Sequence, residues 1–361
     1  MSNSQVRMEP ECLMIDLSGE QRCFNYFWLR DNSPQSRSPN GQRLHESNAI
    51  DRNIRPESAQ IIDEILHVIW PDDHVSDFPL EFLERHSGDH SETPVYYWDA
   101  GIADEIGRYD YNEVSRDNSA RRAWLSDVER LGFSVLSNVP TAEGTILDVV
   151  RLFGFVRETN YGRFFEVQAE ERPSNLAYTP IPLSVHTDNP YRDPCPTLQL
   201  LHCLVQAEQG GITAVVDGFN AAQRLREKSP DAFRLLTSTD VTFRYESDDA
   251  ILKSTGPIIS LDGNGEPKRI RINNRSMAPL SMPCESVRPF YDALFAFREI
   301  LEDDGSQFRF RLEPGDLIIL DNERVLHGRA GESIGARHLQ GCYSDRDGLL
   351  STLRVLERDG D

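Results

Sequence analysis

The sequence predicts a mainly β fold with flanking helices, in which a two-sheet barrel of the jelly-roll type follows a small β-rich N-terminal domain. Many short apolar runs alternate with turn residues, as is typical of antiparallel sheets. Only a few longer segments have the helical apolar spacing of about 3.6 residues. A polar stretch at residues 87–94 is interpreted as a linker. We therefore expect a small domain over residues 1–95 and a larger domain over residues 96–361.

Individual runs predict individual elements. Apolar runs bounded by turn residues predict strands in the small domain, at residues 13–15, 24–29 and 61–70. In the larger domain, helices are expected at residues 120–131, at 145–153, from residue 221 and at 287–301. Strands are expected there at residues 132–136, within 198–216, at 258–261 and at 268–272. Two apolar runs within residues 308–320 flank a turn at 313–316, which predicts a hairpin.

The charge balance narrows the set of partners. The chain has 38 Lys and Arg residues against 59 Asp and Glu, a formal net charge of −21. Nucleic acids and anionic membranes bind concentrated basic faces, so we expect neither as a partner. No stretch reaches the ~18–20 apolar residues of a membrane helix, and the first residues have no apolar signal core. The six cysteines form no C-x-x-C pair, which favours reduced thiols in a cytoplasmic protein.

Two metal-ligating side chains stand two residues apart in the run 183–188. Residues two apart on a strand point to the same face, so His186 and Asp188 can bind one ion. His327 follows a late apolar run and precedes Gly328, which permits close backbone approach. Two histidines and one carboxylate form the facial triad of iron(II) sites, which leaves positions open on the metal. Those positions suit a chelating 2-oxo acid and O₂.

An arginine downstream of His327 indicates which 2-oxo acid binds. Arg337 can form a bidentate fork to the distal carboxylate of 2-oxoglutarate, and Thr213 can add a hydroxyl to the same carboxylate. The remaining histidines, among them His202 and His338, are not accompanied by further candidate ligands and are interpreted as packing or surface residues.

Further motifs run in order along nearly the whole chain. They are VHTD (185–188), LQLLHC (198–203), GG (210–211), VDGF (216–219), DN (321–322), LHGR (326–329) and RHLQG (337–341), together with WLRDN (28–32) and WPDDH (70–74) in the N-terminal part. This set resembles the γ-butyrobetaine hydroxylase branch of the taurine-dioxygenase-like oxygenases. The resemblance implies a double-stranded β-helix core, a small N-terminal domain and a homodimer.

The resemblance also implies the chemistry. Family members couple decarboxylation of 2-oxoglutarate to hydroxylation of an unactivated C–H bond, with ascorbate as a stimulant. The matching residues here would be His186, Asp188 and His327 for iron and Arg337 for 2-oxoglutarate. Family members commonly hold a structural zinc in the N-terminal domain with three cysteines and a histidine. Here the loop 32–38 has no cysteine and only His74 remains, so we expect no structural zinc.

The same resemblance implies a small trimethylammonium substrate. A trimethylammonium group has no N–H to donate, so its recognition depends on aromatic faces. The positions that match the family's aromatic cage are Tyr161, Phe165, Tyr178 and Tyr343.

The anionic end of the substrate is expected to differ from that of the betaine hydroxylases. Asn175, Asn189 and Asn274 match or neighbour the family's carboxylate-binding positions, and Arg275 adds a guanidinium. An extra cation suits a group with more charge and more oxygens. This resembles the subgroup that hydroxylates 2-(trimethylamino)ethylphosphonate at C1, with Asn189, Tyr191, Asn274 and Arg275 around the phosphonate. The alternative is γ-butyrobetaine hydroxylation to carnitine, with Arg275 paired to a nearby acid.

Other functions are less well supported by the residues. A sensor protein without catalysis is disfavoured by the intact triad and by Arg337. Oxidative halogenation requires replacement of the carboxylate ligand, which Asp188 argues against. Trimethyllysine remains a further candidate substrate, but no partners for its amino acid head are identified.

Overall fold

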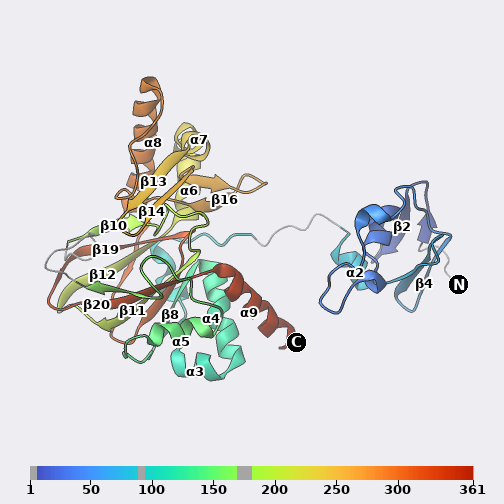
Figure 1. The fold of residues 1–361 in the computed structure, drawn as a ribbon, viewed down its shortest axis with the longest axis horizontal. Coiled ribbons are helices and arrows are strands. Elements are labelled where there is room, and N and C mark those ends of the chain that lie inside the picture. The colour runs from blue at the N-terminus through green and yellow to red at the C-terminus, as the bar shows by residue number, and fades with distance from the viewer. Residues whose placement is uncertain (1–5, 88–93, 169–180, 361) are drawn as a thin grey trace. The chain divides into compact units, whose positions relative to one another are not determined.

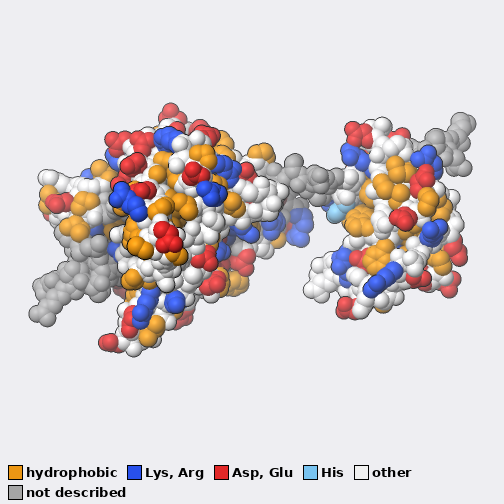
Figure 2. Space-filling view, turned by 90° about the horizontal axis from the view of Figure 1, so that it is seen from above, with side chains coloured by type: hydrophobic (Ala, Val, Ile, Leu, Met, Phe, Trp, Pro, Cys, Tyr) orange, Lys and Arg blue, Asp and Glu red, His pale blue; other side chains and the backbone are white. Residues whose placement is uncertain are grey.

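The computed structural model describes residues 6–87, 94–168 and 181–360. The chain divides into two compact units, Met1–Pro94 and Val95–Asp361 (Figure 1). Most of the expected linker lies outside the described residues. No helix within the described ranges is both long and apolar enough to cross a membrane. Figure 2 shows acidic side chains scattered over the visible face of the larger unit, with basic side chains between them.

The N-terminal unit is built from two small antiparallel sheets and short helices. One sheet has the order β1 (Val6–Met8), β2 (Cys12–Leu17), β3 (Glu20–Asn25), and the other has the order β4 (Ser58–Ile62), β5 (Ile65–Ile69), β6 (Val75–Pro79). The short helices are α1 (Tyr26–Asp31), η1 (Pro34–Ser36), η2 (Ser47–Ala49) and α2 (Leu80–Arg85). Their shared core includes Leu13, Leu29, Leu66, Trp70 and Phe78, all nearly inaccessible to solvent.

One expected strand in this unit is wrong in part. The apolar run at residues 24–29 starts in β3 but continues as helix α1. The cause is local, because the side chain of Asn25 accepts a hydrogen bond from the backbone N–H of Trp28. This bond satisfies a free donor of the first helical turn and favours a helix start at that position.

The larger unit has two main sheets, and the jelly-roll prediction is confirmed. Among the described residues, one sheet has the order β7 (Arg108–Asp110), β8 (Phe133–Ser137), β18 (Leu317–Asp321), β11 (Leu198–Val205), β20 (His338–Ser344), β9 (Phe165–Gln168). The other has the order β10 (Leu183–His186), β19 (Val325–Ile334), β12 (Gln209–Asp217), β17 (Phe308–Phe310). Two hairpins, β13 (Val241–Glu246) with β14 (Ile251–Gly256) and β15 (Ile259–Leu261) with β16 (Pro267–Ile270), complete the β structure.

Helices cover the outer faces of both sheets (Figure 1). Helices α4 (Asn118–Leu131), α5 (Thr145–Arg151) and α9 (Arg346–Arg358) pack on the sheet that contains β11, and α6 (Gly218–Lys228), α7 (Pro230–Ser238) and α8 (Cys284–Glu302) pack on the sheet that contains β12. Shorter helical segments are η3 (Ala100–Glu105) and α3 (Tyr111–Arg116). The expected helices correspond to α4, α5, α6 and α8, whereas α7 and α9 were not predicted from the sequence.

Side-chain alternation along the strands separates an inner from an outer core. Leu200 packs in the outer core with α4 and α5, whereas its neighbour Leu201 packs between the two sheets. Likewise, Val216 faces α6 and Val215 faces inward. Successive residues on a strand point to opposite faces, so inner positions recur at every second residue. This period of two selects the residues that reach the barrel interior.

The hairpin expected within residues 308–320 does not form. Both strands exist, but β17 pairs with β12 and β18 pairs with β8 and β11. The turn at Gly315 connects the two sheets instead, and its backbone exchanges hydrogen bonds with Cys203 and Val139. Turn chemistry predicted the change of direction correctly, but it does not determine which sheet receives each strand.

Candidate metal centre and active-site cavity

The pairing of β10 with β19 brings the predicted metal ligands together. His186 lies directly opposite His327 in the register of these antiparallel strands. Val185 and Leu326 face the outer core, so the two histidines that follow them face the barrel interior. Asp188 follows His186 by two residues, and one ligand atom from each of the three residues lies within 4.8 Å of the others.

Gly328 sets the distance between these two strands. A Cβ atom at this position would lie 2.4 Å from the carbonyl oxygen of Leu183 and 3.0 Å from the backbone nitrogen of Val185. Any larger residue would push β10 away from β19. The close approach expected at Gly328 is therefore confirmed.

The protonation of the triad suits a divalent metal. The Nδ1 atom of His186 lies 3.0 Å from the carbonyl oxygen of Ser184, a contact that orients the ring with Nε2 toward Asp188. Burial lowers the pKa of His327 to about 3, helped by the nearby His186 and Arg275. Burial alone would raise the pKa of Asp188, but its contacts with His186 and His327 and the charge of Arg275 lower it below its usual range.

The side chains therefore fit a metal ion. The Nε2 atom of His186 lies 3.3 Å from Oδ1 of Asp188, so both atoms face the same point. The Nδ1 atom of His327 is buried without a hydrogen-bond partner among the described residues. Nitrogen ligands must be unprotonated and carboxylate ligands ionised for metal binding. One carboxylate and two imidazoles are the donor set of iron(II) facial triads.

Hydrogen bonds from neighbouring residues hold both the side chain and the backbone of Asp188 in place. Its Oδ2 atom accepts hydrogen bonds from Nε2 of Gln199, at 2.7 Å, and from the hydroxyl of Tyr343, at 3.0 Å. The amide of Asn322 bonds both the N–H and the carbonyl of Asp188, at 2.7 and 2.9 Å. Gln199 was not predicted to be a site residue from the sequence. Its place between the outward-facing Leu198 and Leu200 is the signal that would have revealed it.

A cavity of about 480 Å³ opens beside the triad. Thirteen of the residues that line it are polar or aromatic and bear on the site: Tyr161, Phe165, His186, Asp188, Asn189, Tyr191, Gln199, Thr213, Tyr245, Arg275, His327, Arg337 and Tyr343. Of the other expected site residues, Tyr178 and Asn175 lie outside the described part of the chain.

Asn274 is not among the residues that line the cavity. It is exposed to solvent, whereas Asn273 is buried and lines the cavity. Residues 274–276 form a turn, in which neighbouring side chains point in unrelated directions. The amide of Asn273 donates to the carbonyl of Thr187 and accepts from the N–H of Arg275, so it supports the turn that carries Arg275.

Five aromatic rings form a continuous cluster along the cavity. Phe165 lies 5.2 Å from Tyr343 and 5.9 Å from Tyr161, measured between ring centroids. Tyr191 stacks on Tyr245 at 5.2 Å, and its hydroxyl lies 3.0 Å from that of Tyr161. Tyr245 comes from β13 and was not identified from the sequence. We call Tyr161, Phe165, Tyr191, Tyr245 and Tyr343 the aromatic wall.

Two arginines that line the cavity have no acidic partner in the described ranges. Arg337 forms no ion pair there, and burial with the nearby charge of Arg329 lowers its pKa to about 10. Arg275 likewise forms no ion pair with a described residue. It lines the cavity and is exposed to solvent. A third cation, Arg244, is paired with Glu246.

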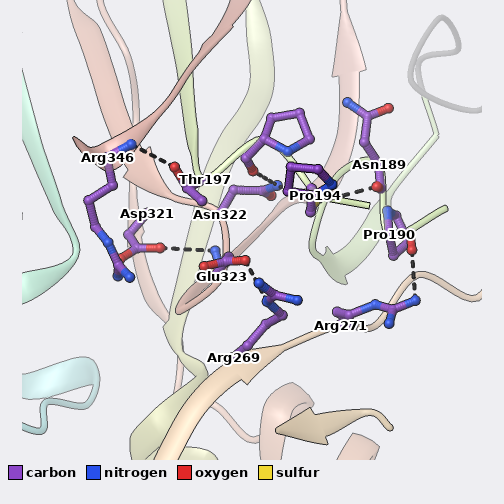
Figure 3. Close-up of polar contacts among 12 residues, drawn as sticks. Asn189, Pro190, Pro194, Thr197, Arg269, Arg271, Asp321, Asn322, Glu323 and Arg346 are labelled. Atoms are coloured by element: carbon purple, nitrogen blue, oxygen red, sulfur yellow. Dashed lines mark hydrogen bonds and ion pairs between the residues drawn. The ribbon is translucent and has the colours of Figure 1, made fainter. Parts of the chain in front are cut away.

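A polar network anchors the segment that follows Asp188 (Figure 3). Arg271 donates to the carbonyl of Pro190 at 2.9 Å, and Asn322 donates to that of Pro196 at 2.9 Å. The backbone N–H of Arg346 donates to the hydroxyl of Thr197 at 2.6 Å. Fixed at both ends, the segment presents Asn189, whose buried amide Nδ2 has no hydrogen-bond partner among the described residues.

Comparison with known proteins agrees with this site. Residues 94–343 match the model of the taurine catabolism dioxygenase TauD, TfdA family. The chain is 35% identical to the γ-butyrobetaine dioxygenase of Pseudomonas sp. (strain AK-1), over 93% of this chain and 91% of that protein. It is 33% identical to the human γ-butyrobetaine dioxygenase, over 94% and 92% of the two chains. It is also 30% identical to the mouse mitochondrial trimethyllysine dioxygenase, over 98% and 87%.

The chain therefore belongs to the TauD/TfdA family of dioxygenases. Its His186, Asp188 and His327 form an iron-binding triad in the interior of a jelly-roll barrel.

The fit at Gly328 gives a first prediction. We expect Gly328→Ala to lower the free energy of unfolding by ~1–3 kcal/mol, because its methyl group meets the backbone of β10. Urea unfolding of the full chain measures this. The control is Gly263→Ala, where an added Cβ has no heavy atom of a described residue within 4 Å, and where a change within about 0.5 kcal/mol is expected. Equal stability of the two variants would contradict the close approach.

Proposed function

We propose that this protein is an Fe(II)- and 2-oxoglutarate-dependent hydroxylase of a small trimethylammonium zwitterion. The observation that carries the proposal is the content of one cavity. It combines an iron-binding triad, an arginine without an acidic partner in the described residues, and the aromatic wall. The dioxygenases of γ-butyrobetaine and trimethyllysine among its relatives support the same substrate class.

The roles of the protein groups near the metal follow from the facial triad. His186, Asp188 and His327 would hold iron(II) on one side and leave the other side open. Bound there, iron(II) would supply O₂ activation coupled to the decarboxylation of 2-oxoglutarate. The surrounding inner-face side chains restrict water access, because the triad is mostly buried in the barrel.

Arg337 and Thr213 are suited to bind 2-oxoglutarate. A guanidinium without an acidic partner among the described residues is costly to bury and is stabilised by an incoming carboxylate. Thr213 is an inner-face residue of β12, opposite Arg329 of β19, and lines the same cavity. Its hydroxyl can donate to the same carboxylate. Binding at this end would leave the 2-oxo acid group of the ligand free to chelate the metal.

The aromatic wall is suited to bind a trimethylammonium group. Cation–π contact with each aromatic face contributes about 0.5–2 kcal/mol, and several faces meet at this cavity. Burial raises the pKa of Tyr191 and of Tyr343 above the usual range, so both rings stay neutral at physiological pH. The hydroxyl contact between Tyr161 and Tyr191 holds two of the rings together.

For the anionic end of the substrate, we propose a phosphonate, as in 2-(trimethylamino)ethylphosphonate with hydroxylation at C1. Two observations support it. Arg275 lines the cavity without an acidic partner in the described part of the chain, and the buried amide of Asn189 has an unused donor. Asn274, which does not line the cavity, is not included among the residues proposed to bind the phosphonate. γ-Butyrobetaine is the alternative, favoured by the identity to γ-butyrobetaine dioxygenases.

Asp188→Ala tests the metal assignment. We expect no succinate release from this variant and no visible charge-transfer band after anaerobic addition of iron(II) and 2-oxoglutarate, because one of three ligands is gone. Asp231→Ala, which removes an exposed carboxylate on α7, is the control and should behave as the wild type. A band of normal strength in Asp188→Ala would show that the metal binds elsewhere.

Arg275→Ala tests the phosphonate assignment. We expect kcat/KM for 2-(trimethylamino)ethylphosphonate to fall about 10- to 100-fold more than that for γ-butyrobetaine, because a charge-assisted bond contributes roughly 1.5–3 kcal/mol. The control is Arg244→Ala, which removes a cavity cation already paired with Glu246 and should leave the ratio of the two substrates unchanged. An equal loss on both substrates in Arg275→Ala would favour γ-butyrobetaine or another zwitterion.

We also propose a homodimer in the cytoplasm. The reducing compartment is supported by the six cysteines, all of which are free thiols in the structure. Light scattering of the purified full chain should give twice the 41.1 kDa mass of one chain, and a monomer mass would reject the dimer.

A further inference from the structure

Two donors occupy one oxygen of the metal-binding carboxylate. Oδ2 of Asp188 accepts from Gln199 at 2.7 Å and from Tyr343 at 3.0 Å. The other oxygen, Oδ1, faces Nε2 of His186 at 3.3 Å. The two oxygens of this carboxylate are therefore not equivalent, and the difference comes from the protein.

The fold places both donors there together. Gln199 of β11 lies directly opposite Tyr343 of β20 in the strand register. Both are inner-face residues, since Leu198, Leu200 and Cys342 face the outer core. Only 2% of Gln199 and 4% of Tyr343 is exposed, so water cannot readily replace either donor. Opposed residues on adjacent strands are close enough for their side chains to converge on one atom.

We propose that Gln199 and Tyr343 are positioning residues that reserve Oδ2, so that Asp188 offers only Oδ1 to the metal. A carboxylate can bind a metal through one oxygen or through both. Binding through both would use one of the three positions that the facial triad leaves open. A chelating 2-oxo acid and O₂ together need all three. Hydrogen bonds that hold a metal ligand in one geometry commonly tune the affinity of the site.

Tyr343 consequently has two separable functions. Its ring belongs to the aromatic wall, 5.2 Å from Phe165, and its hydroxyl holds the metal ligand. The role of the ring in binding the substrate rests on the proposed function. The role of the hydroxyl does not depend on the identity of the substrate, because it concerns the metal ligand alone.

The test is Co(II) binding to the full chain without substrate, followed by absorption and calorimetry. We expect Tyr343→Phe and Gln199→Met each to weaken Co(II) binding ~10- to 100-fold, as loss of a hydrogen bond to a metal ligand commonly does, and to change the Co(II) absorption spectrum. The matched control is Tyr245→Phe, which removes a hydroxyl from the same aromatic wall that makes no hydrogen bond to Asp188. Its Co(II) affinity and spectrum should equal those of the wild type.

A second measurement separates positioning from general damage to the fold. Tyr343→Phe keeps the aromatic ring, so its affinity for tetramethylammonium should stay within about twofold of the wild type, and the metal-free variant should still unfold in one cooperative transition. Unchanged Co(II) affinity and spectrum in folded Tyr343→Phe and Gln199→Met would overturn the proposal. Failure of the proposed substrate class would appear differently, as absent succinate release by the wild type with every trimethylammonium zwitterion, whatever the Co(II) result.

Discussion

The antiparallel pairing of β10 with β19 is the constraint on which the site depends. It places His186 opposite His327, and the two strands can approach this closely because Gly328 has no side chain. Asp188 joins them because it lies two residues beyond His186. The segment after Asp188 is in turn fixed by Asn322, which follows β18. A shift of β10 by one residue against β19 would turn His186 toward the outer core and separate it from His327.

The cavity contains positively charged side chains, whereas the molecule as a whole is negatively charged. The chain carries a formal net charge of −21, yet its cavity holds Arg275 and Arg337 without acidic partners among the described residues. Burying a carboxylate such as Asp188 is costly unless hydrogen bonds and opposite charges compensate, and here the hydrogen bonds from Gln199 and Tyr343 and the nearby charge of Arg275 provide them. Two cations at different places in one cavity suit two anionic ligands, a 2-oxo acid and the anionic end of a zwitterion. The aromatic wall supplies the third requirement, a face for a cation without N–H donors.

Local patterns in the sequence predicted much of the fold and the metal ligands. The spacing of His186 and Asp188 and the late His327 identified the three ligands, although β10 ends at His186 and Asp188 lies in a bend just beyond it, where the strand period no longer applies. Pairing between distant strands was not accessible in this way, so β17 and β18 were wrongly joined as a hairpin. For the same reason Gln199 and Tyr245 were missed, since their roles depend on which strands lie opposite them. In the turn at residues 274–276 no periodicity exists, and Asn274 was chosen where Asn273 lines the cavity.

The central claim is that O₂ is consumed jointly by 2-oxoglutarate and by a trimethylammonium substrate in this cavity. A single turnover of the iron-loaded enzyme under ¹⁸O₂, analysed by mass spectrometry, tests it most directly. With 2-(trimethylamino)ethylphosphonate or γ-butyrobetaine present, one labelled oxygen atom should appear in succinate and one in the hydroxylated product. Labelled succinate without any hydroxylated product, for every such zwitterion, would contradict the account of the substrate. Absence of succinate altogether would contradict the account of the site.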